Sequence, residues 1–313
     1  MEPRKLIRLG NSSFAIALPK DWIDKSGLKK GDDVFIEKNS NGEIIVSSEF
    51  KKGEDKQIEI ALDKVDNDLL KKHLHAAYIK GYNTVKVKGN SKETKMLKEL
   101  LGDYISFELM DSNGEEILIK DFFDIKEIKF ENLVKRIDTN LKEMFEIIKR
   151  DVESGKLTTK TLKEIEEIDK EVNKFYFLCS RVFMKGVDNP TVLNILKMNG
   201  GELFNSWWIA FHLESLGDGL KYVARWINKS ESFDRGAISD FISKLHKEYS
   251  KSMESFYSRD SKKALEVIQN TKMLKNDLEK LEKDPKNLKL TAALDLIEKN
   301  VYQNAKMVFH MRY

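Results

Sequence analysis

From residue 127 to the end of the chain, apolar residues recur every three or four positions, and this periodicity constrains the fold more than any other feature of the sequence. It is the period of amphipathic α-helices. Only four prolines occur in the 313 residues, and none lies between Pro19 and Pro190, so long helices are permitted. We expect residues 127–313 to form an all-α bundle of six helices. The third should run from Pro190 to about Asn228, loosened at Gly200-Gly201.

The bundle region contains an internal similarity at a spacing of 81 residues. Five apolar positions of the third helix match five positions of the sixth, namely Leu213, Leu216, Leu220, Ala224 and Ile227 against Leu294, Ile297, Val301, Ala305 and Val308. This predicts two three-helix repeats. Because all amphipathic helices share the same period, a chance match is the alternative.

Residues 50–125 alternate between strand and helix patterns, which predicts a small α/β domain of order β-α-β-α-β-β. The last two strands should be joined through residues 111–114. The sequence does not indicate a role for this domain. The expected strands are 57–62, 84–87, 105–109 and 116–119, and the expected helices are 66–80 and 92–101.

Residues 1–48 read as two short hairpins with one short helix between them. Gly10-Asn11 predicts the first turn, residues 39–42 predict the second, and Pro19 and Gly27 bound the helix. A chain this short rarely closes a core without metal, disulfides or a partner. We therefore expect this domain to form a homodimer.

Charge is balanced over the whole chain, with a net value of +3, which argues against nonspecific coating of nucleic acid or anionic lipid. The positive charge gathers at the start, where residues 1–20 hold four basic side chains and one acidic one. A dimer would double these groups into one cationic surface that can contact DNA. The alternative is that they only promote solubility. The four candidates are Arg4, Lys5, Arg8 and Lys20.

No apolar run exceeds five residues, whereas a membrane helix needs roughly 20. The first residues lack the apolar stretch of a secretory signal, and Cys179 is the only cysteine. We expect a cytoplasmic protein without membrane insertion. The common catalytic and phosphate-binding motifs are absent from the sequence, so we expect no enzyme activity.

Two pairs of polar residues on predicted helices are candidates for binding a divalent metal ion. Glu214 and Asp218 are four residues apart, on the helix side opposite the apolar residues, which places two oxygen donors within reach of one cation. Asp169 and Asn173 form a weaker pair of the same spacing. The simpler interpretation of Glu214 and Asp218 is a solvated acidic pair, but Trp207, Phe211 and Tyr222 lie beside it and favour a contact surface. At the equivalent positions of the sixth helix, Asp295 is followed by Lys299, which would repel a cation.

The N-terminal stretch from Arg8 to Trp22, containing Leu18-Pro19-Lys20, is followed by Gly27-Leu-Lys-Lys-Gly-Asp-Asp-Val34. Together they resemble the SpoVT/AbrB swapped-hairpin family. The resemblance implies that two chains interlock into one barrel-like unit, which in that family often binds DNA.

The helical region resembles the phosphate-uptake regulator family PhoU, whose members contain two three-helix repeats with E(D)xxxD motifs. Leu213-Glu-Ser-Leu-Gly-Asp218 is the nearest likeness, and Asp169 to Asn173, continuing through Phe175 to Arg181, resembles the first-repeat motif with Asn in place of its second carboxylate. A swapped-hairpin head joined to a PhoU-like tail resembles a known archaeal arrangement.

These resemblances imply a regulator of phosphate uptake that contacts DNA through its N-terminal dimer. Its helical bundle would sense a metal ion or contact components of the phosphate ABC transporter. The alternative is a dimeric adaptor that acts through protein contacts without binding DNA. Toxin neutralisation, known among swapped-hairpin proteins, fits less well because such proteins usually carry a short flexible tail.

Overall fold

The computed structural model describes residues 3–38, 42–49, 56–61, 67–88, 91–112, 116–155, 158–187, 189–230 and 233–311. The chain divides into two compact units, Met1–Glu54 and Asp55–Tyr313. The boundary between the two units lies close to residue 48, the predicted end of the N-terminal domain. The α/β region and the helical region, which the sequence analysis treated as separate domains, belong to the same unit.

The N-terminal unit consists of two antiparallel hairpins and one short helix, as predicted. In the first hairpin Arg8 lies opposite Phe14, and the left-handed Gly10, with φ +70°, follows its first strand. Residues 39–41 of the second predicted turn lie outside the described residues. The elements are β1 (Ile7–Leu9), β2 (Ser13–Ala15), α1 (Lys20–Lys25), β3 (Phe35–Lys38) and β4 (Ile44–Ser47).

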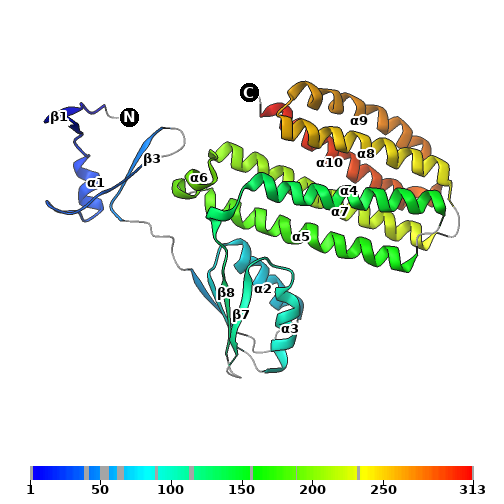
Figure 1. The fold of residues 1–313 in the computed structure, drawn as a ribbon, viewed down its shortest axis with the longest axis horizontal. Coiled ribbons are helices and arrows are strands. Elements are labelled where there is room, and N and C mark those ends of the chain that lie inside the picture. The colour runs from blue at the N-terminus through cyan, green and yellow to red at the C-terminus, as the bar shows by residue number, and fades with distance from the viewer. Residues whose placement is uncertain are drawn as a thin grey trace. The chain divides into compact units, whose positions relative to one another are not determined.

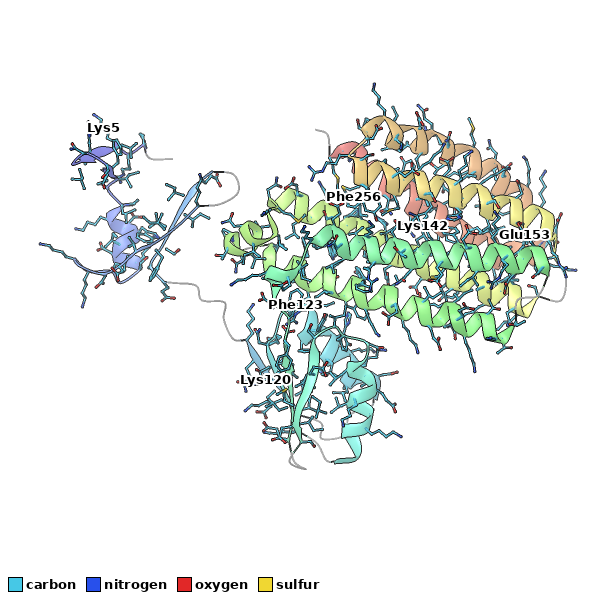
Figure 2. The ribbon with its side chains drawn as sticks, in the orientation of Figure 1. Lys5, Lys120, Phe123, Lys142, Glu153 and Phe256 are labelled. Carbon is cyan, nitrogen blue, oxygen red and sulfur yellow. The ribbon has the colours of Figure 1, made fainter. Side chains whose placement is uncertain are left out.

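No residue described between positions 3 and 49 is buried within the single chain. Large apolar side chains are exposed instead, among them Leu6 (71%), Phe14 (65%) and Ile36 (68%). Figure 2 shows the side chains of this unit, Lys5 among them, projecting outward from a thin ribbon. In a lone copy these described residues therefore form no hydrophobic core, as expected for a domain of this length.

The α/β region has the predicted order of strands and helices. Its sheet is arranged β5-β6-β8-β7, with β5 and β6 parallel and the other neighbours antiparallel. Residues 113 and 114 of the predicted last turn lie outside the described residues. The prediction is wrong for Asp111 and Ser112, which belong to the strand Phe107–Ser112, expected at 105–109. The elements are β5 (Gln57–Ala61), α2 (Asn67–Ile79), β6 (Thr84–Lys88), α3 (Ser91–Leu101), β7 (Phe107–Ser112) and β8 (Glu116–Asp121).

Both helices of this region lie on the same face of the sheet (Figure 1). The covered face holds a core that includes Leu74 of α2, Leu97 of α3 and Ile117 of β8. The opposite face carries charged side chains, such as the pair Lys86 and Glu116. Alternation of apolar and polar residues along each strand produces this division.

Six long helices form the bundle, lying side by side along their length (Figure 1). It begins at Phe130 rather than at 127, because residues 125–127 form a separate 3-10 turn capped by Asp124. In the part of the chain that the structure describes, no helix has the length and apolar content needed to cross a bilayer. The helices are α4 (Phe130–Ser154), α5 (Thr159–Gly186), α7 (Gly200–Lys229), α8 (Arg235–Ser258), α9 (Ser261–Glu282) and α10 (Leu288–His310).

The predicted continuous helix from Pro190 to Asn228 is wrong, because the chain there forms two helices, α6 (Pro190–Leu196) and α7. Lys197 adopts the left-handed conformation, with φ 55°, and ends α6. Asn199 and Glu202 then form a capping box that starts α7, each side chain bonding the other's backbone N–H at 2.9 Å. The break therefore lies just before the Gly200-Gly201 pair.

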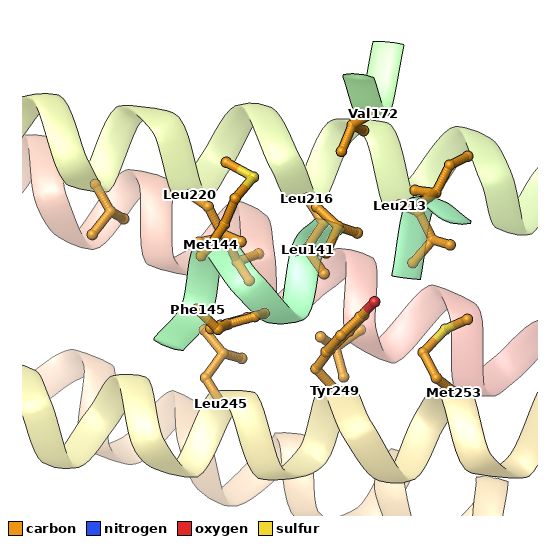
Figure 3. Packing of buried hydrophobic residues seen from close by; sticks show 14 of the residues in the cluster. Leu141, Met144, Phe145, Val172, Leu213, Leu216, Leu220, Leu245, Tyr249 and Met253 are labelled. Carbon is orange, nitrogen blue, oxygen red and sulfur yellow. The ribbon is translucent and has the colours of Figure 1, made fainter. Parts of the chain in front are cut away.

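Leucines of α7 fill the centre of the bundle. Figure 3 shows Leu220 beside Met144 of α4 and Leu216 beside Leu141, with Tyr249 on the facing α8. The five apolar residues that predicted a repeat in α7 and the five in α10 are all buried. Burial is what any amphipathic helix in this position would show, so the duplication itself stays a prediction.

A buried arginine joins the α/β region to the bundle. Arg181 of α5 is fully buried, pairs with Asp121 at the end of β8, and donates hydrogen bonds to the carbonyl oxygens of Tyr78 and Tyr82, the latter at 3.0 Å. Its guanidinium carbon lies 4.7 Å from the centre of the Tyr78 ring. Arg181 of the bundle thus contacts both the end of β8, at Asp121, and the C-terminal end of α2, at Tyr78.

Candidate functional site

The metal-binding candidates meet at the seam between α5 and α7. Asp169 of α5 is buried, whereas Glu214 and Asp218 of α7 are half-buried. This side of α7, which the sequence analysis placed opposite the apolar residues, packs along α5, while the Asp218 side chain stays 42% exposed. Trp207 lies on the same side, where its Nε1 donates to Ser180 Oγ at 3.1 Å and its ring stacks on Phe183 at 4.6 Å.

Lys221 links the carboxylates of the two helices. Its Nζ lies 2.6 Å from Asp169 Oδ2 and 2.6 Å from Asp218 Oδ1. The sequence analysis missed Lys221, although its place three residues after Asp218 put it on the same side of the helix. Asn173, the remaining candidate, donates weakly to Asp169 Oδ2 at 3.5 Å.

A second ion pair extends the seam by one helical turn. Arg225 of α7 donates from Nε and Nη2 to Glu166 Oε1 of α5, at 3.0 and 2.7 Å. Beside these pairs lies an open depression of about 270 Å³. Its lining carries both signs of charge and consists of Lys163, Glu166, Glu167, Asp169, Lys170, Lys221 and Arg225.

Burial and mutual repulsion shift the titration of this cluster. Burial raises the pKa of Glu214 to about 7, and the charges of Asp218 and Asp169 add to the effect. Burial also raises the pKa of Asp169, partly offset by Lys221. Burial alone would lower the pKa of Lys221, but its hydrogen bonds to Asp169 and Asp218 outweigh it and hold that pKa above the ordinary value.

A divalent ion would have to share this seam with the Lys221 ammonium group. The described residues contain no group of three or more His, Cys, Asp or Glu side chains arranged to hold a metal ion. The donor set of Asp169, Asn173, Glu214 and Asp218 therefore does not fit a metal while Lys221 keeps its two contacts. In α10, Asp295 and Lys299 pair with each other.

The four basic candidates for DNA contact are all exposed in the N-terminal unit. Arg4 and Lys5 precede β1, Arg8 lies within it, and Lys20 is the first residue of α1. The Arg8 Nε donates to the carbonyl oxygen of Gly10 at 3.1 Å, which holds its guanidinium beside the hairpin turn. Their exposure leaves these charges accessible to phosphate groups.

Apolar and aromatic side chains also reach the surface of α7. Phe204 is 42% exposed, Phe211 38% and Tyr222 57%. The rings of Phe204 and Phe211 both stack against that of Trp208, at 5.7 and 5.8 Å. Of the three aromatic residues predicted beside Glu214, Phe211 and Tyr222 are exposed, whereas Trp207 is half-buried and stacks on Phe183.

Comparison with known proteins finds a likeness at the N-terminus. Residues 7–55 match the family described as antidote-toxin recognition MazE, bacterial antitoxin. The matched range includes Arg8 and Lys20 and begins after Arg4 and Lys5. Searches of the curated proteins and of the solved structures find no match. The chain therefore carries a MazE/AbrB-type domain at its N-terminus, and the likeness of residues 127–313 to the PhoU family stays a prediction.

Proposed function

We propose that this protein is a non-enzymatic regulator that binds DNA as a homodimer through its N-terminal unit. The observation that carries the proposal is that this unit exposes large apolar side chains and buries no described residue in a single copy. A second copy would cover those side chains and supply the missing core. The match of residues 7–55 to the MazE family supports a regulatory domain of this kind.

The same pairing would create the surface that contacts DNA. Arg4, Lys5, Arg8 and Lys20 are exposed in each copy, so a dimer presents eight cationic groups. Phosphate contacts from such groups supply most of the nonspecific affinity of DNA-binding proteins and orient them on the duplex.

The helical bundle would carry the regulatory input, which we propose to be phosphate supply. This part of the proposal rests on the likeness of Leu213 to Asp218 to the PhoU motif. The exposed aromatic surface formed by Phe204, Phe211 and Tyr222 is the region that would contact components of the phosphate ABC transporter.

Toxin neutralisation is a second candidate, because the matched family is described as an antitoxin. We rank it below DNA binding alone, since residues 55–313 form a large compact unit rather than a short flexible tail. A dimeric adaptor without DNA binding is the third candidate.

Light scattering and gel retardation of the full chain test the proposal together. We expect a dimer at micromolar concentration and DNA retardation that weakens with salt. The Arg4→Ala/Arg8→Ala variant removes four charges per dimer, so the magnitude of the slope of log K against log salt should fall by up to about 3.6, at ~0.9 per phosphate contact. The matched control is Lys25→Ala/Lys29→Ala, which removes the same charge from exposed positions outside the first hairpin.

A monomer in light scattering would contradict the dimer. If no DNA is retarded even at low salt, the adaptor becomes the better interpretation, because phosphate contacts are strongest there. An unchanged affinity and salt slope in Arg4→Ala/Arg8→Ala would exclude this surface. Co-purification from phosphate-limited and phosphate-replete cells tests the input, since a regulator of phosphate uptake should change its bound partners between the two.

A further inference from the structure

One face of α7 carries a repeat that packing within the bundle does not fully cover. Six residues on this face are spaced alternately by four and three positions, which is the 3.5-residue period of the contact line in a coiled coil. None of the six is buried, and Phe204, Phe211 and Tyr222 are 42%, 38% and 57% exposed. We call this set the α7 stripe, and it consists of Phe204, Trp208, Phe211, Ser215, Asp218 and Tyr222.

The aromatic half of the α7 stripe is held in place before any partner arrives. The rings of Phe204 and Phe211 stack on that of Trp208, at 5.7 and 5.8 Å between ring centres. Trp207 supports them from the side of α5, since its ring lies 6.1 Å from that of Trp208 and stacks on Phe183. Rings that are already ordered lose little side-chain entropy when a partner covers them, so this surface is suited to packing against another helix.

The charges at the two ends of the α7 stripe favour an antiparallel copy of the same helix as its partner. Near the N-terminal end Lys197 is exposed, and Arg259, with an 83% exposed side chain, lies 4.0 Å from Glu202. At the other end Asp218 and Glu214 bring two carboxylates against one lysine. Two parallel copies would place like charges together. A two-fold axis across the stripe instead brings the basic end of each copy to the acidic end of the other.

The spacing of large and small side chains also suits this direction. With the axis between Trp208 and Phe211, Trp208 of each copy lies opposite the partner's Phe211. Phe204 then lies opposite the partner's Ser215, so that a large ring meets a small side chain. Such alternation lets two helices interdigitate as knobs into holes.

We propose that a second copy of this chain covers the α7 stripe, with the two α7 helices packed antiparallel about a two-fold axis near Trp208 and Phe211. The inference rests on the homodimer of the proposed function. Because β4 ends at Ser47 and β5 begins at Gln57, a dimer joined through its N-terminal units keeps the two bundles at a roughly millimolar effective concentration. Components of the transporter would have to displace the second copy to reach the same aromatic residues.

Cysteine cross-linking of the full chain tests this pairing, because Cys179 is the one cysteine of the sequence and is fully buried. Phe211 lies close to the proposed axis, so Phe211→Cys should give a disulfide-linked dimer on oxidation with diamide. Tyr222→Cys is the matched control, an exposed aromatic position of the same stripe. Antiparallel packing would separate its two copies by roughly 35 Å along the helices, at about 1.5 Å per residue, so we expect no cross-link there.

A second variant keeps the test independent of the loss of the Phe211 ring. Phe204→Cys/Ser215→Cys places a thiol at each of two positions that lie opposite one another in the proposed pair. We expect the double variant to form the linked dimer and each single variant to form none.

Light scattering separates the failure of this inference from the failure of the dimer on which it rests. A dimer in which neither Phe211→Cys nor Phe204→Cys/Ser215→Cys cross-links would overturn the pairing and leave the N-terminal dimer in place. Cross-linking of Tyr222→Cys as readily as Phe211→Cys would indicate parallel or random contact and overturn the pairing as well. A monomer would overturn both.

Discussion

At the scale of single residues, Glu214 couples the α5–α7 seam to pH. Its carboxyl group is half-buried near Asp169 and Asp218, and its pKa is raised to about 7 from an ordinary value of 4.5. The folded protein therefore holds this proton more tightly than the unfolded chain. The stability gained from the protonated group is complete below pH 4.5 and is lost as the pH rises through about 7.

Glu214→Gln keeps the group neutral at every pH, so we expect it to stabilise the protein at high pH. The gain in the free energy of unfolding should reach roughly 2–3 kcal/mol at pH 8 and vanish near pH 4.5. Urea unfolding across this range measures it, with Glu167→Gln at an exposed position of the same depression as the control. A gain that is independent of pH would show that the carboxyl does not titrate between the two values.

At the scale of the elements, the close approach of α7 and α10 depends on a glycine. A Cβ atom at Gly219 would lie 2.6 Å from Cγ1 of Ile297, and Ile297 is fully buried. Gly200, at the start of the same helix, has no atom within 4 Å of a Cβ placed there. Alanine at position 219 would change both the helix propensity and the packing against α10, whereas alanine at position 200 would change the helix propensity alone.

We expect Gly219→Ala to lower the free energy of unfolding by about 1–2 kcal/mol, although alanine is the better helix former by ~1 kcal/mol. Gly200→Ala should be neutral or stabilising. Denaturant unfolding of both variants makes the comparison. Equal effects of the two substitutions would mean that α10 can shift away from α7 at no cost.

The sequence predicts where individual helices and strands lie better than it predicts which of them pack against one another. Gly10 and Gly27 mark local turns, so the N-terminal elements follow from short-range rules. The start of α7 was missed because Asn199 and Glu202 were taken as helix interior, although their spacing is that of a capping box. The contact between Lys221 and Asp169 could not be predicted in this way. These residues lie 52 positions apart, and their meeting depends on which helices are neighbours and how each is rotated.

At the scale of the whole molecule, Arg181 is one of the contacts that join the α/β region to the bundle, beside the packing of the Phe177 ring on His75 at 4.4 Å. The side chains of both Arg181 and Asp121 are fully buried. A variant that lacks the arginine leaves the Asp121 carboxylate with the Phe123 backbone N–H, at 3.1 Å, and with Lys185, at 3.6 Å. Breaking such a pair typically costs about 3–5 kcal/mol. Arg181 and Asp121 lie 60 residues apart in the sequence, so no local pattern predicts that they pair.

We expect Arg181→Met to uncouple the sheet from the bundle. Hydrogen exchange should show amides of β6 and β8 opening at a lower free energy, while those of α8 to α10 keep their protection. Arg136→Met is the control, because Arg136 is exposed and lies over the ring of Phe175 at 5.5 Å. Unchanged protection of the sheet in Arg181→Met would show that other contacts join the two parts.

Because the described residues of the N-terminal unit form no core in a single copy, the folding of this unit should depend on how many copies of the protein a cell contains. Where a segment acquires its core only from an identical neighbour, folding and association are a single bimolecular equilibrium. The folded fraction of that segment then grows with chain concentration, while residues 55–313 stay folded throughout. At low chain concentration the N-terminal unit would be unfolded while residues 55–313 stayed folded. The expression level of the protein would then set a threshold for its action.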